Sequence, residues 1–155
     1  MDSRLIAADV ARGVSRLFAL QGLVVLPEVP LPNGRRTDIT AMDAKGRITI
    51  VEIKVSRADL HGDGKWPDYM EYCDRFYWAL AAGLDASILD QESHRPDASG
   101  LIVADRYGAA VVREAQALPL SAARRKAEWL RLGRIAMRRN MLLADTEIFA
   151  PQSSI

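Results

Sequence analysis

The spacing of hydrophobic residues changes along the chain, and each change predicts a different element. From residue 4 to residue 20, apolar side chains recur every three or four positions, which predicts an amphipathic helix. Ser3 is a typical N-cap residue for this helix, and Gly22 is a typical residue to end it. A second strong helical pattern covers residues 121 to about 143, and Gly133 predicts a break within it.

Between these helices, three short segments alternate apolar and polar positions or are continuously apolar, which predicts β-strands. Asn33-Gly34 is the strongest hairpin signal in the sequence, and Asp43-Ala44-Lys45-Gly46 predicts a second turn. The strands should therefore form an antiparallel meander, with the third and most apolar strand in the middle of the sheet. They are expected at residues 23–29, 35–42 and 47–55.

The remaining segments complete an expected order of α-β-β-β-α-β-β-α. A polar loop is predicted at 56–66, followed by a helix over 67–82 with one apolar face. A long, loosely ordered connection at 83–100 then leads to a hairpin of two short strands at 101–104 and 109–115. The apolar face of the 67–82 helix is expected to comprise Tyr69, Cys73, Phe76 and Leu80.

The net charge and the cysteine and histidine counts limit which kinds of site the protein can have, but they do not identify a binding partner. The 155 residues carry a formal net charge of +1, so only a local cluster of charge could bind a polyanion. The single cysteine, Cys73, forms no internal disulfide, and His61 and His94 are too few for a histidine-rich metal cage. We expect one domain over residues 1–150 with a tail at 151–155, a cytoplasmic location, and no membrane span.

Two charged residues interrupt the most apolar strand. Glu52 and Lys54 are two positions apart, so they share one face of the strand and lie about 7 Å from each other along it. A same-face salt bridge is one interpretation. The other adds Asp38 from the preceding strand: Asp38, Glu52 and the carbonyl oxygen of Ile53 would form an all-oxygen site suited to Mg²⁺ or Mn²⁺. Lys54 could then orient or deprotonate a water, or stabilise charge on a phosphate.

The spacing Asp-x₁₃-Glu-x-Lys, on consecutive strands after a leading helix, resembles the PD-(D/E)XK nuclease superfamily. Within it, four blocks resemble the bacterial MmcB-like DNA repair family: "RTDIT", "VEIKVSRADL", "DGKWPDYMEYCDRFYWAL" and "LIVADRYGA". This resemblance implies an α/β (α+β) fold of restriction-endonuclease type, with an αβββαβ core and a mixed central sheet flanked by helices. It also implies that Asp38 and Glu52 are metal ligands and that Lys54 is the catalytic lysine.

The chain departs from the superfamily pattern at two places. Thr37 stands where proline precedes the acid, and Asp9 is the only acid within the first helix, where many members carry a further ligand. The number of metal ions is therefore open. The family blocks also mark a set of positions to which no role is transferred: Asp63, Lys65, Trp66, Tyr69 and Asp74.

Two groups of residues could contact nucleic acid. Lys65 follows the strand that carries Glu52 and Lys54 and is a candidate phosphate contact. The nearby Trp66 and Tyr69 could stack on bases, although such aromatic residues more often belong to the core. On the last helix, one face carries a basic stripe that either contacts phosphates or is a solvated surface. The stripe consists of Arg131, Arg134 and Arg138, with Arg124 seven residues before the first of them.

Two hypotheses follow. The first is a Mg²⁺- or Mn²⁺-dependent endonuclease that hydrolyses phosphodiester bonds of DNA during repair. The second is a non-catalytic DNA-binding or adaptor module on the same scaffold. DNA is the expected partner in both, together with a repair protein or a second copy of the chain.

Overall fold

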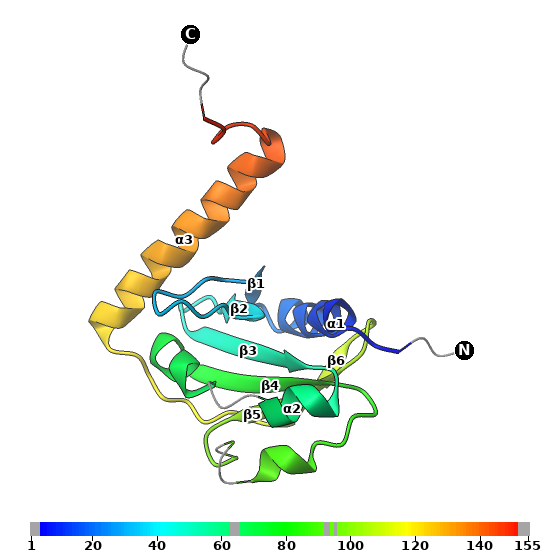
Figure 1. Ribbon diagram of the computed structural model, residues 1–155. Coiled ribbons are helices and arrows are strands. Elements are labelled where there is room, and N and C mark those ends of the chain that lie inside the picture. Colours follow the sequence, from blue (N-terminus) through cyan, green and yellow to red (C-terminus); the bar gives the residue numbers. More distant parts are fainter. Residues whose placement is uncertain (1–3, 63–65, 92–93, 95, 152–155) are drawn as a thin grey trace.

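Six strands form one mixed sheet in the computed structural model, which describes residues 4–62, 66–91, 94 and 96–151 (Figure 1). Spatial order follows chain order, from β1 at one edge to β6 at the other. The first three strands and the last two pair antiparallel, whereas β3, β4 and β5 pair parallel. The strands are β1 (Val24–Pro27), β2 (Ile39–Met42), β3 (Ile48–Lys54), β4 (Arg75–Ala81), β5 (Gly100–Ala104) and β6 (Ala109–Arg113).

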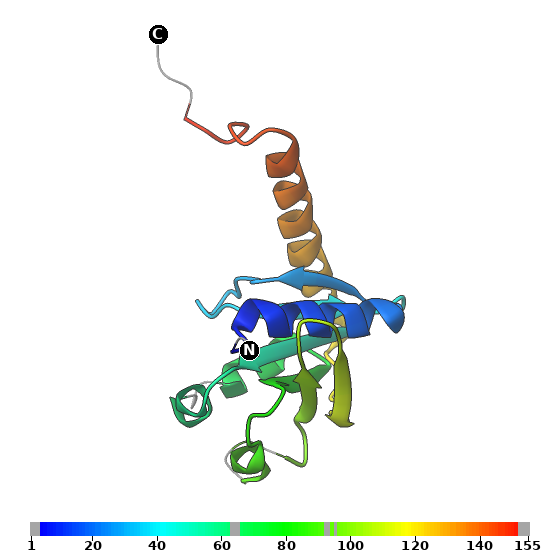
Figure 2. The same cartoon turned by 90° about the vertical axis from the view of Figure 1, so that its right-hand side faces the viewer.

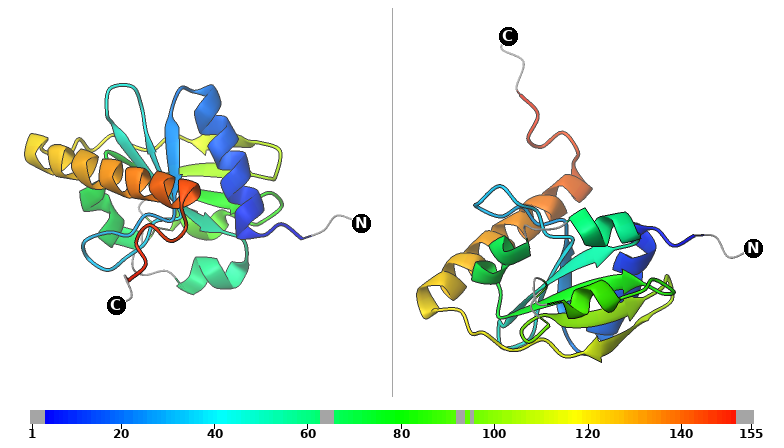
Figure 3. Two further views of the ribbon diagram at one scale, coloured as in Figure 1. Left: turned by 90° about the horizontal axis from the view of Figure 1, so that it is seen from above. Right: turned by 60° about the horizontal axis from the view of Figure 1, so that its bottom comes forward.

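Helices cover both faces of this sheet, as Figure 3 shows. Helix α1 lies against one face, and α2 and η1 lie against the other. A long helix, α3, follows the last strand. The helical elements are α1 (Ala7–Leu20), α2 (Arg57–Gly62), η1 (Trp66–Tyr72), η2 (Ser87–Asp90) and α3 (Ala122–Ala144), where η denotes a 3₁₀ helix.

Alternation along the central strands divides the core in two. Ile50 of β3 packs with Phe76 and Trp78 of β4 on the face covered by α2 and η1, which we call the η1 face. Val51 and Tyr77 point the other way, toward α1, on what we call the α1 face. The central strands are therefore buried on both sides, as is usual for the parallel part of a sheet.

The antiparallel meander is confirmed, and its turns have the expected chemistry. Gly34 and Gly46 have φ angles of +85° and +79°, which glycine adopts without steric cost. Leu31 donates its N–H to the carbonyl of Arg35 at 2.7 Å, which closes the first turn. The third strand has β2 on one side and β4 on the other, so its interior position is also confirmed.

The prediction of a helix over 67–82 is wrong for most of that segment. Only its first part is helical, as η1, and Arg75–Ala81 is a strand between β3 and β5. Phe76 to Ala81 are all buried, so the segment has no exposed polar face to reveal its period. A short, continuously apolar run fits a buried strand as well as a buried helix, and here parallel pairing with β3 decided.

Three smaller expectations also need correction. Residues 57–62 of the expected loop form α2, so α2 and β4, rather than 67–82 and 101–104, complete the αβββαβ order. Helix α1 begins at Ala7 with Ile6 as its N-cap, and Ser3 lies outside the described residues. Helix α3 continues through Gly133 without a break.

Helix α3 touches the rest of the molecule along a narrow line. Only Glu128 and Leu132 are buried within it. Trp129 donates its indole N–H to the carbonyl of Gly46 at 2.8 Å, and Arg139 donates to the carbonyl of Glu28 at 2.7 Å. Figures 1 and 2 show the C-terminal part of α3 running away from the sheet. None of the helices in the described part of the chain combines the length and the apolar character that crossing a bilayer requires.

Candidate active site

Glu52 and Lys54 lie on the η1 face, near the carboxyl end of β3. Only 6 % of Glu52 and 9 % of Lys54 is exposed, so both charges are largely withdrawn from water. Their partners in the parallel register are Trp78 and Leu80 of β4, which continue the apolar layer begun by Ile50. The expectation that the two residues share a face with apolar neighbours upstream is confirmed.

The strand register brings Asp38 beside them. Ile39 pairs with Val51 and Met42 with Ile48 in a regular antiparallel ladder, and the same register continued by one step would align Asp38 with Glu52. No bulge is needed for this alignment. Asp38 accepts a hydrogen bond at 2.7 Å from the N–H of Ile53, the residue between Glu52 and Lys54. The carboxylate of Asp38 therefore lies against the backbone of β3, between the positions of Glu52 and Lys54.

Buried hydroxyl groups hold the segment that carries Asp38. Thr37 is fully buried, and its Oγ1 lies 2.9 Å from Oγ1 of Thr40 and accepts the N–H of Val29 at 3.3 Å. The carbonyl of Asp38 accepts the N–H of Glu28 at 3.0 Å. Threonine thus supplies by side-chain hydrogen bonding the local rigidity that proline would supply through its ring.

An aromatic ring supports Lys54 from the neighbouring strand. The Nζ atom of Lys54 lies 5.8 Å from the centroid of the Trp78 ring, within range of a cation–π interaction. Trp78 is fully buried, and Phe76 meets it edge to face at 5.1 Å. The ammonium group of Lys54 therefore lies against a buried and tightly packed aromatic ring.

His94 is a residue of this neighbourhood that sequence reasoning missed. Its ring is 8 % exposed and lies 5.6 Å from the Trp78 ring, so one indole contacts both His94 and Lys54. His94 belongs to the connection predicted to be loosely ordered, and Trp78 to the segment predicted to be helical. Because the strand that carries Trp78 was predicted to be a helix and His94 lies in a connection, no local signal could place the two residues together.

The acid of the first helix serves another purpose. Asp9 accepts the N–H of Ile6 at 3.0 Å at the start of α1, and its other oxygen lies 3.6 Å from Nε of Arg106. Helix α1 covers the α1 face, whereas Glu52 and Lys54 are on the η1 face. Asp9 therefore supports the helix terminus and its contact with the β5–β6 turn.

The donor atoms at Asp38 and Glu52 suit a hard cation. Carboxylate and carbonyl oxygens are the ligands that Mg²⁺ and Mn²⁺ prefer, and two carboxylates with several waters are a common set for Mg²⁺. Within the described ranges, no cluster of three or more histidine, cysteine, aspartate or glutamate side chains has the arrangement of a metal site. A cation here would be held by two carboxylates, the Ile53 carbonyl and water.

The segment after β3 is only partly described. Asp59 donates its N–H to the hydroxyl oxygen of Ser56 at 3.2 Å, so Ser56 caps the start of α2. The carboxylate of Asp59 accepts the N–H of Val55 at 3.2 Å. Lys65 lies outside the described residues, and Trp66 is described only by its place at the start of η1. The ring of Tyr69 is 7 % exposed and its hydroxyl reaches the carbonyl of Arg36, so a base contact would require this ring to leave the core.

The arginines of the predicted stripe have different surroundings along α3. Arg131 pairs with the buried Glu128 and donates to the carbonyl of Pro30. The guanidinium of Arg138 stacks over Phe149 at 3.6 Å from the ring centroid. All three arginines line one apolar groove. Arg131 is half-buried and held by its internal contacts, whereas Arg134 and Arg138 are exposed.

A six-stranded mixed sheet flanked by helices is consistent with an α+β fold of the nuclease-like class. A family model described as "DNA repair protein MmcB-like" matches residues 2–147, and the chain belongs to this MmcB-like family. Membership indicates a role in DNA repair. The resemblance inferred from the sequence blocks is thereby confirmed at the level of the family.

One solved structure resembles the chain over nearly its whole length. It is the "SPO1766 protein of unknown function from Silicibacter pomeroyi", with 37 % sequence identity and a TM-score of 0.84. The match covers 99 % of this chain and 100 % of that one. A search of curated proteins found no match.

Proposed function

We propose that the chain is a metal-dependent nuclease that hydrolyses phosphodiester bonds of DNA during repair. The observation that carries the proposal is the hydrogen bond from the Ile53 N–H to the Asp38 carboxylate, because Ile53 lies between Glu52 and Lys54 on β3. Two carboxylates and an amine at one point of a largely apolar sheet are costly to bury unless they act on a ligand or on each other.

Asp38, Glu52 and the carbonyl of Ile53 would hold Mg²⁺ or Mn²⁺. When bound, such an ion supplies Lewis acidity toward a phosphoryl oxygen and lowers the pKa of a coordinated water. The Ile53 N–H orients Asp38 through one carboxylate oxygen, so the other oxygen would be the one to bind the ion. Lys54, held against Trp78, would orient the attacking water and neutralise charge that develops on the phosphate.

The test is a cleavage assay with Mg²⁺ or Mn²⁺ on duplex, single-stranded and branched DNA. We expect Glu52→Gln and Lys54→Met each to lower the rate by about 10²-fold or more, which is typical when one charge-stabilising group is lost. Glu147→Gln is a matched control, because Glu147 is exposed beyond α3. Both Glu52 and Glu147 variants should remain folded by circular dichroism. A wild-type protein that cleaves none of these substrates with either metal would contradict the proposal.

The ion pair of Asp9 with Arg106 favours a second candidate function, because it engages the acid of the first helix away from the site. This second function is a DNA-binding or adaptor module without turnover. This candidate predicts DNA binding that persists in Glu52→Gln and needs no divalent metal. A titration of binding against salt, run beside the cleavage assay, separates the two: a steep salt dependence without product would favour the adaptor.

A further inference from the structure

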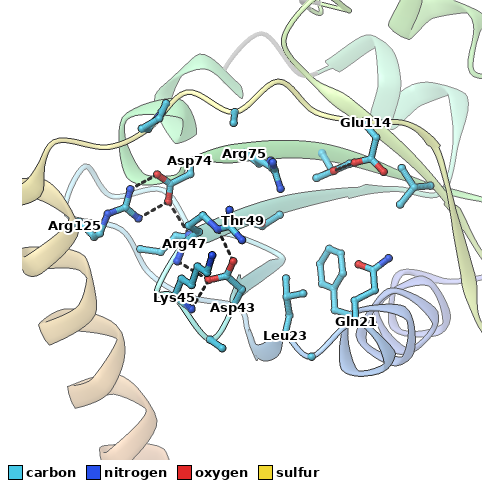
Figure 4. A pocket seen from close by; sticks show the side chains of 18 residues that line it. Gln21, Leu23, Asp43, Lys45, Arg47, Thr49, Asp74, Arg75, Glu114 and Arg125 are labelled. Atoms are coloured by element: carbon cyan, nitrogen blue, oxygen red, sulfur yellow. Dashed lines mark hydrogen bonds and ion pairs between the residues drawn. The ribbon is translucent and has the colours of Figure 1, made fainter.

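A pocket of about 650 Å³ lies on the α1 face of the sheet, on the side away from Glu52 and Lys54 (Figure 4). Thr49, Arg75 and Tyr77 project into it from β3 and β4. The C-terminal end of α1, the β2–β3 turn and the segment after β6 form its sides. Its volume is in the range of small-molecule sites in proteins. Helix α1 is too short to cover this part of the sheet.

The carboxylates around the pocket are already engaged within its wall. Asp43 pairs with Arg47 at 2.6 Å and accepts the N–H of Lys45 at 2.9 Å. Asp74 pairs with Arg125. These interactions are drawn in Figure 4. Two acids and two arginines of the lining therefore neutralise each other.

The third acid, Glu114, binds a tyrosine instead of a cation. Tyr77 donates its hydroxyl to Glu114 at 2.7 Å, and burial together with this bond raises the pKa of Tyr77 to about 12. The Tyr77 ring lies over Gly100, where a Cβ would approach the ring to 2.3 Å. Glycine at 100 is thus what allows the phenol to stand in the pocket wall.

Two cations of the lining remain. Among the residues that the structure describes, the side chains of Arg75 and Lys45 form no hydrogen bond or ion pair. Arg75 extends from β4 toward the middle of the pocket (Figure 4). A guanidinium and an ammonium without internal partners match a dianion, and a phosphate monoester carries close to two negative charges at neutral pH.

The opposite side of the pocket is apolar with a polar edge. The half-buried Leu23 and Val111 offer apolar surface beside the buried Phe18, and Gln21 offers an amide that can both donate and accept. We propose that this pocket binds a phosphate monoester attached to a ring of nucleobase size. Its phosphate would lie at Arg75 and Lys45, and its ring against Leu23 and Val111, with Gln21 at the ring edge.

The test uses deoxyadenosine monophosphate as the probe in isothermal titration calorimetry of the full chain. We expect binding that weakens about tenfold or more when either half of the probe is removed, as deoxyadenosine or as inorganic phosphate. Arg75→Met should weaken binding by a similar factor, and Lys45→Ala, on an exposed turn, provides a second variant. Arg12→Ala is the matched control, an exposed arginine of α1 outside the pocket.

Two further arms complete the experiment. Binding should persist in Glu52→Ala, because that residue faces the other side of the sheet; its loss would place the ligand in the cleavage site and overturn the proposal. Single-stranded DNA with and without a 5′-phosphate identifies the source of the ligand. If the 5′-phosphate raises the affinity for DNA and Arg75→Met removes the increase, the ligand is a strand end. If the 5′-phosphate does not change the affinity, the ligand is a free nucleotide. The proposal is wrong if the monophosphate does not bind or binds no better than inorganic phosphate. It is also wrong if Lys45→Ala and Arg75→Met both bind the monophosphate as tightly as the wild type does.

Discussion

At the scale of single residues, Asp74 connects more of the molecule than any residue of the candidate active site. Its carboxylate accepts the N–H of Ile48 at 2.7 Å and the N–H of Leu120 at 3.0 Å, and it pairs with Arg125 of α3. One side chain therefore ties the start of β3, the segment after β6 and the last helix together. The family resemblance marked Asp74 without a role, and this junction supplies a structural one.

Removing this carboxylate should loosen α3. We expect Asp74→Ala to lower the free energy of unfolding by about 3 kcal/mol, because it leaves two N–H groups and a partly buried guanidinium without their partner. The adjacent pair Arg124–Glu71 is the control: it is exposed and 3.8 Å long, so Glu71→Ala should cost under about 1 kcal/mol. Urea denaturation measures both, and equal losses would contradict the assignment.

The same residue predicts an acid dependence of stability. Burial raises the pKa of Asp74, but hydrogen bonds from Arg125, Ile48 and Leu120 outweigh burial and hold it below its ordinary value. Since the folded pKa is the lower one, the stabilisation is present above the unfolded pKa of about 4 and is lost as the pH falls through the folded pKa. The difference in urea midpoint between wild type and Asp74→Asn should therefore be smaller at pH 2.5 than at pH 5. A difference that stays constant with pH would count against this interpretation.

At the scale of elements, glycine positions show where helices press against the sheet. A Cβ at Gly13 of α1 would lie 2.0 Å from the carbonyl oxygen of Asp105 and 2.5 Å from that of Gly108. Helix α1 therefore sits directly on the β5–β6 turn. Gly133, in the middle of α3, has open space around it. The same residue type thus has a packing role in one helix and none in the other.

Alanine should have opposite effects at these two glycines. In a helix interior, alanine is favoured over glycine by about 1 kcal/mol, so Gly133→Ala should stabilise the protein by up to that amount. Gly13→Ala should destabilise it by about 1–3 kcal/mol, because the backbone of the β5–β6 turn must shift. Thermal unfolding of both variants tests this. Stabilisation by both would show that α1 does not pack as closely as described.

At the scale of the whole molecule, the sheet separates two regions of different chemistry. The η1 face carries Glu52, Lys54 and His94 around one indole, and the α1 face carries the cationic pocket. Helix α3 begins beside the pocket through Arg125 and passes the β1 end of the sheet at Arg139. Beyond that point it exposes apolar and basic side chains together, among them Met137 at 70 %.

If α3 binds DNA, its arginines should differ in effect. Removing one arginine that neutralises a phosphate should reduce the slope of log affinity against log salt by about 1, so Arg134→Ala and Arg138→Ala should flatten the slope and weaken binding to all sequences alike. Arg131→Ala should chiefly lower stability, since its partner Glu128 is 2 % exposed. Arg12→Ala on α1 is the control for nonspecific charge loss. Unchanged slopes in both α3 variants would remove this helix from the DNA interface.

Much of the N-terminal half of the fold could be predicted from sequence because its contacts are local. The Asn33-Gly34 and Asp43–Gly46 turns specify their own geometry, so the β1–β2–β3 meander follows from neighbouring residues. The two-residue period of a strand likewise places Glu52 and Lys54 on one face without further information. The long helical pattern near the C-terminus identified α3 for the same reason.

Long-range pairing decided the rest. The apolar run from Phe76 to Ala81 has no exposed face to reveal its period, and it became a strand because β3 and β5 offered parallel partners on both sides. Only that sheet brings His94 and Lys54 to the Trp78 ring, and only the pairing of β2 with β3 brings the Asp38 carboxylate to the backbone N–H of Ile53. Sequence by itself determined which residues carry the chemistry and how each lies on its own element. The tertiary structure decided which of them meet, because hydrogen bonds between strands far apart in the chain are not encoded in any local period.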